Sequence, residues 1–286
     1  MNADANYSNL VNHVITKGVY REDRTQVGTL SCFGTSHRYD LQNSFPLITS
    51  KRVFWKGVVE ELLWMISGST NSKSLRDKNI HIWDGNSSRS FLDSLNLDYP
   101  VGHLGPVYGH QWRHFNAEYI DGDTNYSNQG HDQLSNVIDQ IKNNPSSRRI
   151  ILSAWNPSQN HLMALPACHT LSQFYVDDGF LSCQLYQRSG DIGLGVPFNI
   201  ASYSLLTCIL AKITNLKPKE FIHVIGDAHI YSTHIDPIKL QMDNEIYPSP
   251  TLNIKAFHSN INDYTFDDFE LINYKCSKPI KMAMAV

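Results

Sequence analysis

The sequence predicts an α+β fold with a mixed sheet, organised as a single domain over residues 1–286. Helical and strand patterns are interspersed along the chain without a regular βαβ rhythm. No linker rich in Pro, Gly or Ser and no internal repeat divides the 286 residues. Hydrophobic residues make up 41 %, which is enough for a large core that needs no disulfide or metal.

Three stretches have helical patterns. Residues 56–66 carry an apolar stripe at helical spacing. Residues 132–143 carry another, with Asp132 placed to cap the helix and Pro145 just past its end. Residues 199–213 form a long apolar helix.

The strand patterns lie between and after these helices. Residues 150–155 are typical of a buried strand. Residues 170–176 and 181–187 alternate at period two around Asp177-Asp178-Gly179, which predicts a hairpin. Residues 221–225 form another strand, which is expected to end at Gly226.

Charge and cysteine content exclude several classes of protein. The net charge is −3, so no bulk attraction to nucleic acid is expected. Charged residues are 18 % and aromatic residues 11 %, a balance that suggests extra surface covered by a partner subunit. The five scattered cysteines without a CxxC motif indicate reduced thiols. Polar residues interrupt the best membrane-span candidate, 200–213, and residues 1–9 do not resemble a signal peptide, so an intracellular soluble protein is expected.

Residues 84–132 are rich in Gly, Asn, Ser, Tyr and His with little periodicity, which indicates functional loops.

Cys168 and His169 are neighbours, and in an extended segment their side chains point to opposite faces, so they do not form a nucleophile–base dyad. Spacing alone favours a small buried residue at Cys168. Glu61 lies on an apolar helix stripe and is equally consistent with a proton carrier of raised pKa and a backbone-bonded carboxylate, while Glu60 is expected to pair with Lys56 in solvent.

Other candidates keep two interpretations each. Arg24, Arg148, Arg149 and Arg188 could converge on a phosphate, although surface ion pairs are the commoner fate of any one of them. His229 and Tyr231 point the same way from an extended backbone, toward a sugar hydroxyl or to stabilise a turn. Asn199 fits a helix N-cap. His110 and His114 have metal-ligand spacing but no third ligand, and no phosphate-binding glycine motif occurs.

Short motifs follow one another in a fixed order: Arg24-Thr25 with Gly28-Thr29-Leu30-Ser31, Phe45-Pro46-Leu47 with Lys51-Arg52, Glu61-Leu62-Leu63-Trp64, Leu104-Gly105-Pro106-Val107-Tyr108-Gly109, Ser147-Arg148-Arg149-Ile150, Leu165-Pro166-Ala167-Cys168-His169, and Cys183-Gln184-Leu185-Tyr186-Gln187-Arg188-Ser189-Gly190-Asp191 with Gly195-Val196-Pro197-Phe198-Asn199-Ile200-Ala201. From about residue 18 to Val286 the chain closely resembles the thymidylate synthase family in its eukaryotic or viral form. Residues 1–17 precede the match, and a poorly ordered N-terminal segment is expected there.

The resemblance implies a methyltransferase that converts dUMP to dTMP. The co-substrate would be 5,10-methylenetetrahydrofolate, which gives the one-carbon unit and a hydride and leaves as dihydrofolate, and no metal is implied. The family fold is a large mixed sheet flanked by helices, with the sheets of two subunits packed back to back in a homodimer. A cytoplasmic location is expected, with the nucleus of a eukaryotic or infected cell as a second.

The resemblance also assigns roles in dUMP binding and chemistry. Cys168 would add to uracil C6, with Arg188 lowering the pKa of its thiol. Glu61 and Tyr108 would move protons, with Asn199 reading uracil rather than cytosine through its amide. The remaining dUMP contacts would be Arg24, Arg148 and Arg149 of the partner subunit, Gln187, Ser189, Gly190, Asp191, His229 and Tyr231.

For the folate, the resemblance implies contacts from Ile82, Trp83, Asn86, Asp191, Gly195 and Ala285, with the C-terminal tail closing over the site. Two positions depart from the family pattern. Gln26 stands where Gly is common and is expected to stiffen the phosphate loop, and His103 stands where Asp is usual and is expected to alter a loop near the folate.

Three other functions fit parts of the pattern. A pyrimidine-nucleotide hydroxymethylase would use water in place of the hydride, but Asn199 argues against the dCMP version. An RNA-binding regulator would not need Cys168 and Glu61, so RNA binding is expected only as a secondary role. A cysteine hydrolase conflicts with the opposed directions of Cys168 and His169.

Overall fold

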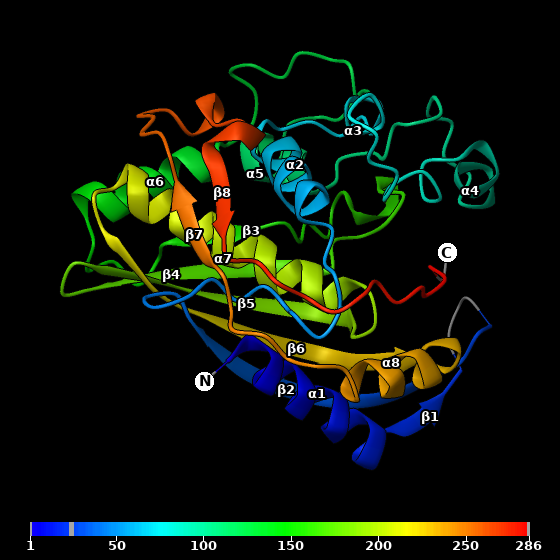
Figure 1. Ribbon diagram of the computed structural model, residues 1–286. Coiled ribbons are helices and arrows are strands. Elements are labelled where there is room, and N and C mark those ends of the chain that lie inside the picture. The colour runs from blue at the N-terminus through cyan, green and yellow to red at the C-terminus, as the bar shows by residue number, and fades with distance from the viewer. Residues whose placement is uncertain (1, 23–25, 285–286) are drawn as a thin grey trace.

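The fold is built on one mixed sheet, seen in a computed structural model that describes residues 2–22 and 26–284 (Figure 1). In this described part, six strands run in the order β1-β2-β6-β5-β4-β3. Strands β5 and β6 are parallel, and the other neighbouring strands are antiparallel. The predicted α+β class with a mixed sheet is therefore confirmed. In sheet order the strands are Val19–Arg21, Thr29–Asp40, Lys217–Tyr231, Phe180–Asp191, His169–Asp177 and Ile151–Ser153.

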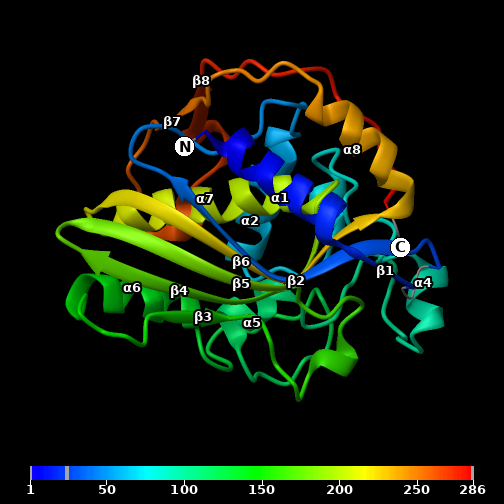
Figure 2. The same cartoon turned by 90° about the horizontal axis from the view of Figure 1, so that it is seen from below.

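Helices cover the sheet unequally. Helix α7 (Gly195–Ile213) packs on β5 and β6, and α1 (Ala3–Lys17) packs on β2. Figure 2 shows α1, α7 and α8 on the same side of the sheet. Helix α2 (Trp55–Ile66) packs between α7 and α5 (Tyr108–His114). The remaining helices and the separate hairpin are α3 (Lys73–Arg76), α4 (Arg89–Ser94), α6 (Gln133–Asn143), α8 (Ile235–Met242), β7 (Thr251–Ile254) and β8 (Phe269–Ile272).

Helix α7 is the central core helix. It is apolar all round, and 89 % of its 18-residue apolar window is buried inside the fold. By length and composition it could cross a membrane, and it is the one described helix that could. A helix enclosed by its own sheet and neighbouring helices needs an apolar surface on every side, so its composition is explained by the core.

Several predicted elements are confirmed. Helix α2 covers residues 56–66, and α6 begins after Asp132, whose carboxylate accepts a hydrogen bond from the Ser135 N–H at 3.0 Å. Strands β4 and β5 form the predicted hairpin. Its turn residues Asp178 and Gly179 both have positive φ, 46° and 77°, as a tight two-residue hairpin turn requires.

Other boundaries were wrong. The strand predicted at 221–225 is β6, which continues through Gly226 to Tyr231. A Cβ on Gly226 would lie 2.8 Å from the Arg188 carbonyl oxygen and 2.9 Å from the Tyr186 hydroxyl, so this glycine permits a close approach of strands rather than ending one. Helix α7 begins at Gly195, four residues earlier than predicted, and β3 covers only the middle of 150–155.

The expectation of a poorly ordered segment at 1–17 was also wrong, because α1 occupies residues 3–17. Its buried face consists of Tyr7, Leu10, Val11 and Val14, at the i, i+3, i+4, i+7 spacing of a helix. The fully buried Asp4 carboxylate accepts hydrogen bonds from the backbone of residues 49 and 50, which ties this helix to the segment that leads into α2.

Candidate active site

The Cys168 turn is held from two sides. Cys168 directly precedes β4, as the Pro166 signal predicted, and its backbone N–H donates to the Tyr108 hydroxyl at 2.8 Å. The Arg188 guanidinium, from the end of β5, donates to the carbonyls of Pro166 (2.7 Å) and Ala167 (2.9 Å). Arginine and tyrosine therefore fix the backbone around the thiol, which an isolated loop could not do.

His169 is not a base for Cys168. Its ring centroid lies 5.2 Å from the ring centroids of both Tyr108 and Tyr203. Burial lowers the pKa of His169, and a hydrogen bond to Asn199 offsets only part of this effect, so the pKa is about 4. A group of that pKa is neutral and weakly basic at pH 7. The structure thus disfavours the cysteine hydrolase, and it joins His169 to the site through Asn199, a role that our sequence analysis missed.

Glu61 combines partial burial with a specific partner. Its Oε1 accepts a hydrogen bond from the Trp83 indole N–H at 2.8 Å. Desolvation raises the pKa of Glu61 from 4.5 to about 7, which the Trp83 bond only partly offsets. The Trp83 ring also lies 6.3 Å from the Tyr108 ring. The predicted proton-transfer pair Glu61 and Tyr108 therefore lies in one cluster, and the pKa fits the proton-carrier interpretation.

The neighbouring carboxylate was misassigned. Glu60 is only 5 % exposed, and its carboxylate pairs with the Lys78 ammonium. Lys56 instead donates to the Lys78 carbonyl at 3.2 Å. Helical i−4 spacing pointed to Lys56, but the turn after α3 brings Lys78 closer, a contact between elements that local spacing does not predict.

The ends of β5 and β6 bring together residues far apart in the sequence. Their parallel register sets Ser189 beside Asp227 and Asp191 beside His229. The rings of His229 and Tyr231 lie 5.2 Å apart, so the two side chains share a face as predicted. The His229 Nδ1 lies 3.3 Å from an Asp227 carboxylate oxygen. This edge therefore collects the residues expected at a nucleotide phosphate and sugar.

Asn199 is not an N-cap, because α7 begins at Gly195 and its N-cap is Leu194. Its Oδ1 accepts a hydrogen bond from the Gln187 Nε2 at 3.0 Å. The same Gln187 nitrogen donates to the Ser189 carbonyl at 2.9 Å. Both amides are at least nine-tenths buried, so the first turn of α7 and the end of β5 share one fixed polar contact.

Asp191 is linked to the C-terminal tail. Its Oδ1 accepts from the Gly193 N–H at 2.8 Å and lies 3.5 Å from the His234 Nδ1. The His234 Nε2 donates to the carbonyl of Ala283 in the tail at 2.7 Å. Burial lowers the pKa of His234, but the Asp191 carboxylate outweighs this and the net shift is upward.

Lys51 approaches the same place from another element. Its ammonium donates to the Gly193 carbonyl. Burial lowers the pKa of Lys51 to about 8, although the negative charge of Asp191 partly offsets this effect. The sequence analysis named Lys51 within a family motif but gave it no role, and it did not name His234. His234 follows Tyr231 by three residues, which is the only local signal that could have found it.

The other predicted residues divide into three groups. Trp83 and Asn86 are buried and Ile82 is partly buried in the turns after α3, while Gly190 and Gly195 lie at the end of β5 and the start of α7. Arg148 and Arg149 lie just before β3, and both side chains are exposed. Arg24 and Ala285 lie outside the described residues.

Of the two departures from the family pattern, the structure explains His103 and does not explain Gln26. Gln26 has φ of 61°, a left-handed conformation that a glycine adopts at less cost. His103 is buried, and its Nδ1 accepts from the Gly122 N–H at 3.0 Å while its Nε2 lies 3.4 Å from Asp123. The loop at 121–123 is therefore attached through His103 to the segment that leads to Tyr108.

The histidine pair on α5 has a structural role. The His110 Nε2 lies 3.3 Å from the Ala117 carbonyl, and its ring packs 5.9 Å from that of His114. Among the described residues, no group of three His, Cys, Asp or Glu side chains could hold a metal ion.

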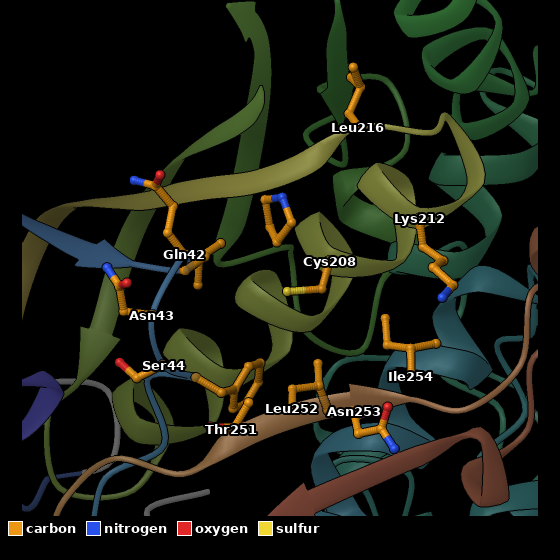
Figure 3. A pocket seen from close by; sticks show the side chains of 13 residues that line it. Gln42, Asn43, Ser44, Cys208, Lys212, Leu216, Thr251, Leu252, Asn253 and Ile254 are labelled. Atoms are coloured by element: carbon orange, nitrogen blue, oxygen red, sulfur yellow. The ribbon is translucent and has the colours of Figure 1, made fainter. Parts of the chain in front are cut away.

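A separate hollow lies away from these residues (Figure 3). Its volume is about 320 Å³, and it is lined by residues 41–45, by Cys208 and Lys212 of α7, by Leu216 and Pro218, and by β7. Burial raises the pKa of Cys208 to about 12, so this thiol is not a nucleophile. The hollow contains none of the predicted site residues and is not the candidate active site.

Comparison with known proteins identifies the family. A family model described as Thymidylate synthase matches residues 5–286. The chain belongs to the thymidylate synthase family. It is 58 % identical to human thymidylate synthase over 98 % of this chain and 90 % of that protein. It is 57 % identical to the thymidylate synthase of human herpesvirus 8, covering 98 % of this chain and 83 % of that one.

Bifunctional relatives are equally similar. The bifunctional dihydrofolate reductase-thymidylate synthase 2 of Arabidopsis thaliana is 59 % identical over 98 % of this chain and 50 % of that protein. The chain thus spans about half the length of the plant bifunctional relatives that it matches. The family model indicates that the matched half of these relatives is their thymidylate synthase part.

Proposed function

We propose that this thymidylate synthase chain catalyses the reductive methylation of dUMP to dTMP with 5,10-methylenetetrahydrofolate, releasing dihydrofolate. The observation that carries the proposal is the convergence of three features: the braced Cys168 turn, the buried Asn199 amide and the Glu61 carboxyl with a pKa of about 7. This reaction needs a nucleophile, a side chain that recognises the uracil ring and a group that carries protons. We further propose a single domain and a cytoplasmic location.

Each residue has a definite task in this proposal. The Cys168 sulfur forms a bond to uracil C6, and the C5–C6 π electrons move to O4, which makes C5 nucleophilic. Asn199 donates to O4 and accepts from N3–H. Glu61 exchanges the proton at O4. C5 then forms a bond to the one-carbon unit of the folate and loses its proton through the Glu61 and Tyr108 network, and the bond from that carbon to the folate nitrogen breaks. When the folate hydride reaches that carbon, the C6–S bond breaks, which returns the thiolate and restores the C5–C6 double bond.

The phosphate and sugar would lie at the shared edge of β5 and β6. We assign the phosphate to Arg188, Ser189 and Arg24, and the ribose 3′-hydroxyl to His229 and Tyr231. The register of β5 with β6 supports this assignment because it sets Ser189 and Asp191 beside the residues of the β6 end. Gln187 and Gly190 complete the strand that lines the nucleotide.

The surrounding residues suit the folate, whose methylene group and hydride supply the one-carbon unit and its reduction when it is bound. Trp83 donates to Glu61, and we assign a wall of the folate site to it together with Ile82 and Asn86. Asp191 would offer a carboxylate acceptor to pterin N–H groups. The bond from His234 to Ala283 supports a tail that closes on the folate and excludes water.

We propose that two copies assemble into a homodimer through the open face of the sheet. Leu171 and Tyr186 are directly opposed in register on this face and are 37 % and 40 % exposed, and Tyr175 is 63 % exposed. Apolar side chains gathered on an uncovered sheet need a partner. Arg148 and Arg149 are exposed, and we propose that they reach the phosphate site of the other subunit.

The direct test is turnover of purified protein with dUMP and methylenetetrahydrofolate. We expect dihydrofolate absorbance to rise in step with a nucleotide product that is heavier by one CH₂ unit. A hydroxymethyl product without dihydrofolate would indicate the hydroxymethylase, and tight RNA binding without turnover would indicate the regulator. Either result would overturn the proposal.

Mixing two inactive variants tests the shared site. We expect homodimers of Cys168→Ala and of Arg148→Ala/Arg149→Ala to be nearly inactive. Random mixing makes half of the dimers heterodimers with one intact site each, so about a quarter of the wild-type activity should return. Mixing Cys168→Ala with a chain that carries all three substitutions should restore none. Mixed dimers seen by native mass spectrometry without recovered activity would contradict shared arginines.

A further inference from the structure

A buried chain of hydrogen bonds leads from β6 to the base-reading amide. The His223 Nε2 lies 2.8 Å from the Gln187 Oε1. The Gln187 Nε2 in turn donates to the Asn199 Oδ1 at 3.0 Å. His223 and Gln187 are 1 % and 2 % exposed, so neither can exchange its partner for water.

The direction of every bond in this chain is fixed. The Ser189 carbonyl can only accept, so the atom of Gln187 that lies 2.9 Å from it is the amide nitrogen. The Gln187 oxygen must then face His223, and His223 must present an N–H at Nε2. Burial lowers the pKa of His223 to about 3, so the ring is neutral and carries a single N–H at pH 7.

The same direction extends to Asn199. Because the Gln187 nitrogen donates to it, the near atom of Asn199 is its oxygen, and the NH₂ group points the other way. An Asn199 amide turned by 180° would set two NH₂ groups against each other. That turned amide would offer an acceptor where uracil O4 needs a donor, which is the pattern that suits the amino group of cytosine.

We infer that His223 is a positioning residue for base selection: its N–H holds Gln187, and Gln187 holds Asn199, in the amide orientation that reads uracil and rejects cytosine. This inference rests on the proposed function, because it assumes that Asn199 faces the base. In this proposal the buried His223 acts through Gln187 and not on the base itself. Its ring lies against Phe221 at 5.4 Å, and the titratable groups that face it are His169 and His37.

The bond to Ser189 is a second constraint on Gln187, so loss of His223 weakens the orientation without abolishing it. A buried hydrogen bond is worth about 1 kcal/mol net, which corresponds to about a fivefold change in an equilibrium constant. We therefore expect His223→Leu to lower the ratio of dCMP to dUMP dissociation constants by about fivefold. The dissociation constant for dUMP should rise and that for dCMP should fall.

The test measures both dissociation constants by calorimetry without folate, so that it is independent of turnover. His223→Gln sets a side-chain N–H at the same reach and should restore the wild-type ratio. His110→Leu is the matched control, since it also removes a fully buried histidine but lies outside the chain of bonds. It should lower the urea midpoint and leave the ratio unchanged.

The outcomes separate the two proposals. A wild-type protein that does not prefer dUMP over dCMP would contradict the proposed function itself. A wild-type preference that His223→Leu leaves intact would overturn only the role of His223. Equal losses in His223→Leu and His223→Gln would show that the imidazole acts by packing rather than as a donor, and that too would overturn the inference.

Discussion

Replacing Cys168 by alanine is expected to lower kcat by about 10⁴-fold or more, as removal of a catalytic nucleophile does in other enzymes. Uracil C5 is too weak a nucleophile unless a thiolate has first added to C6, so no other residue can substitute for the sulfur. dUMP should still bind within about tenfold of the wild type, because the phosphate, sugar and base contacts remain. Turnover is followed by dihydrofolate absorbance and binding by calorimetry.

Cys208→Ala is the matched control. Its thiol lines the hollow of Figure 3 on the far half of α7, and its raised pKa makes it unreactive. We expect kcat within about twofold of the wild type for this variant, since it touches no reacting atom. Full turnover by Cys168→Ala, or an equal loss of turnover in Cys168→Ala and Cys208→Ala, would contradict the nucleophile assignment.

Local pattern predicted those elements whose signals lie within one segment. The α2 stripe, the Asp132 cap and the Asp178-Gly179 turn each depend on a few neighbouring residues, and each is confirmed. Helix α1 has the same kind of signal in its spacing of buried residues, and it was missed because residues 1–9 were examined only for a targeting signal.

Errors occurred where tertiary contacts determine the outcome. Gly226 was interpreted as a strand end, but it permits the close approach of β5 and β6. Glu60 was paired with Lys56 on its own helix, whereas Lys78 is brought to it by a turn. In both cases the local signal was correct in kind but was outweighed by a neighbour distant in sequence.

Assembly of the site depends on register, which no local signal specifies. Asp191 and His229 become neighbours only because β5 and β6 are parallel and aligned at that point. Resemblance to the family supplied their roles without this geometry. It gave no role to Lys51, His234 or His223, whose partners on other elements appear only once the strands are aligned.

Replacing Glu61 by glutamine is expected to lower kcat by about 10² to 10⁴-fold, the usual contribution of a general acid–base group. Glutamine keeps an acceptor for the Trp83 N–H but cannot carry a proton at pH 7. The wild-type profile of kcat against pH should show an ionisation near 7, where desolvation places the pKa of Glu61. That ionisation should be absent from the residual activity of the variant.

Stability provides an independent readout of the same group. The folded pKa of about 7 lies above the ordinary 4.5, so the native state binds more protons than the unfolded state between these values. The contribution of Glu61 to the free energy of unfolding should therefore fall as pH rises from about 4.5 to 7, by about 3 kcal/mol. The difference in the free energy of unfolding between the wild type and Glu61→Gln should therefore change by this amount across that range, as measured by urea unfolding.

Glu60→Gln separates a proton carrier from a merely buried carboxylate. Glu60 is the residue before Glu61 on α2 and is buried, but its partner is the Lys78 ammonium rather than an indole N–H beside Tyr108. Losing that charge pair should lower stability and leave the ionisation near pH 7 in kcat intact. If Glu60→Gln removed the ionisation and Glu61→Gln kept it, the proton carrier would be Glu60 and not Glu61. The proposed roles of Trp83 and Tyr108 beside it would then have to be abandoned.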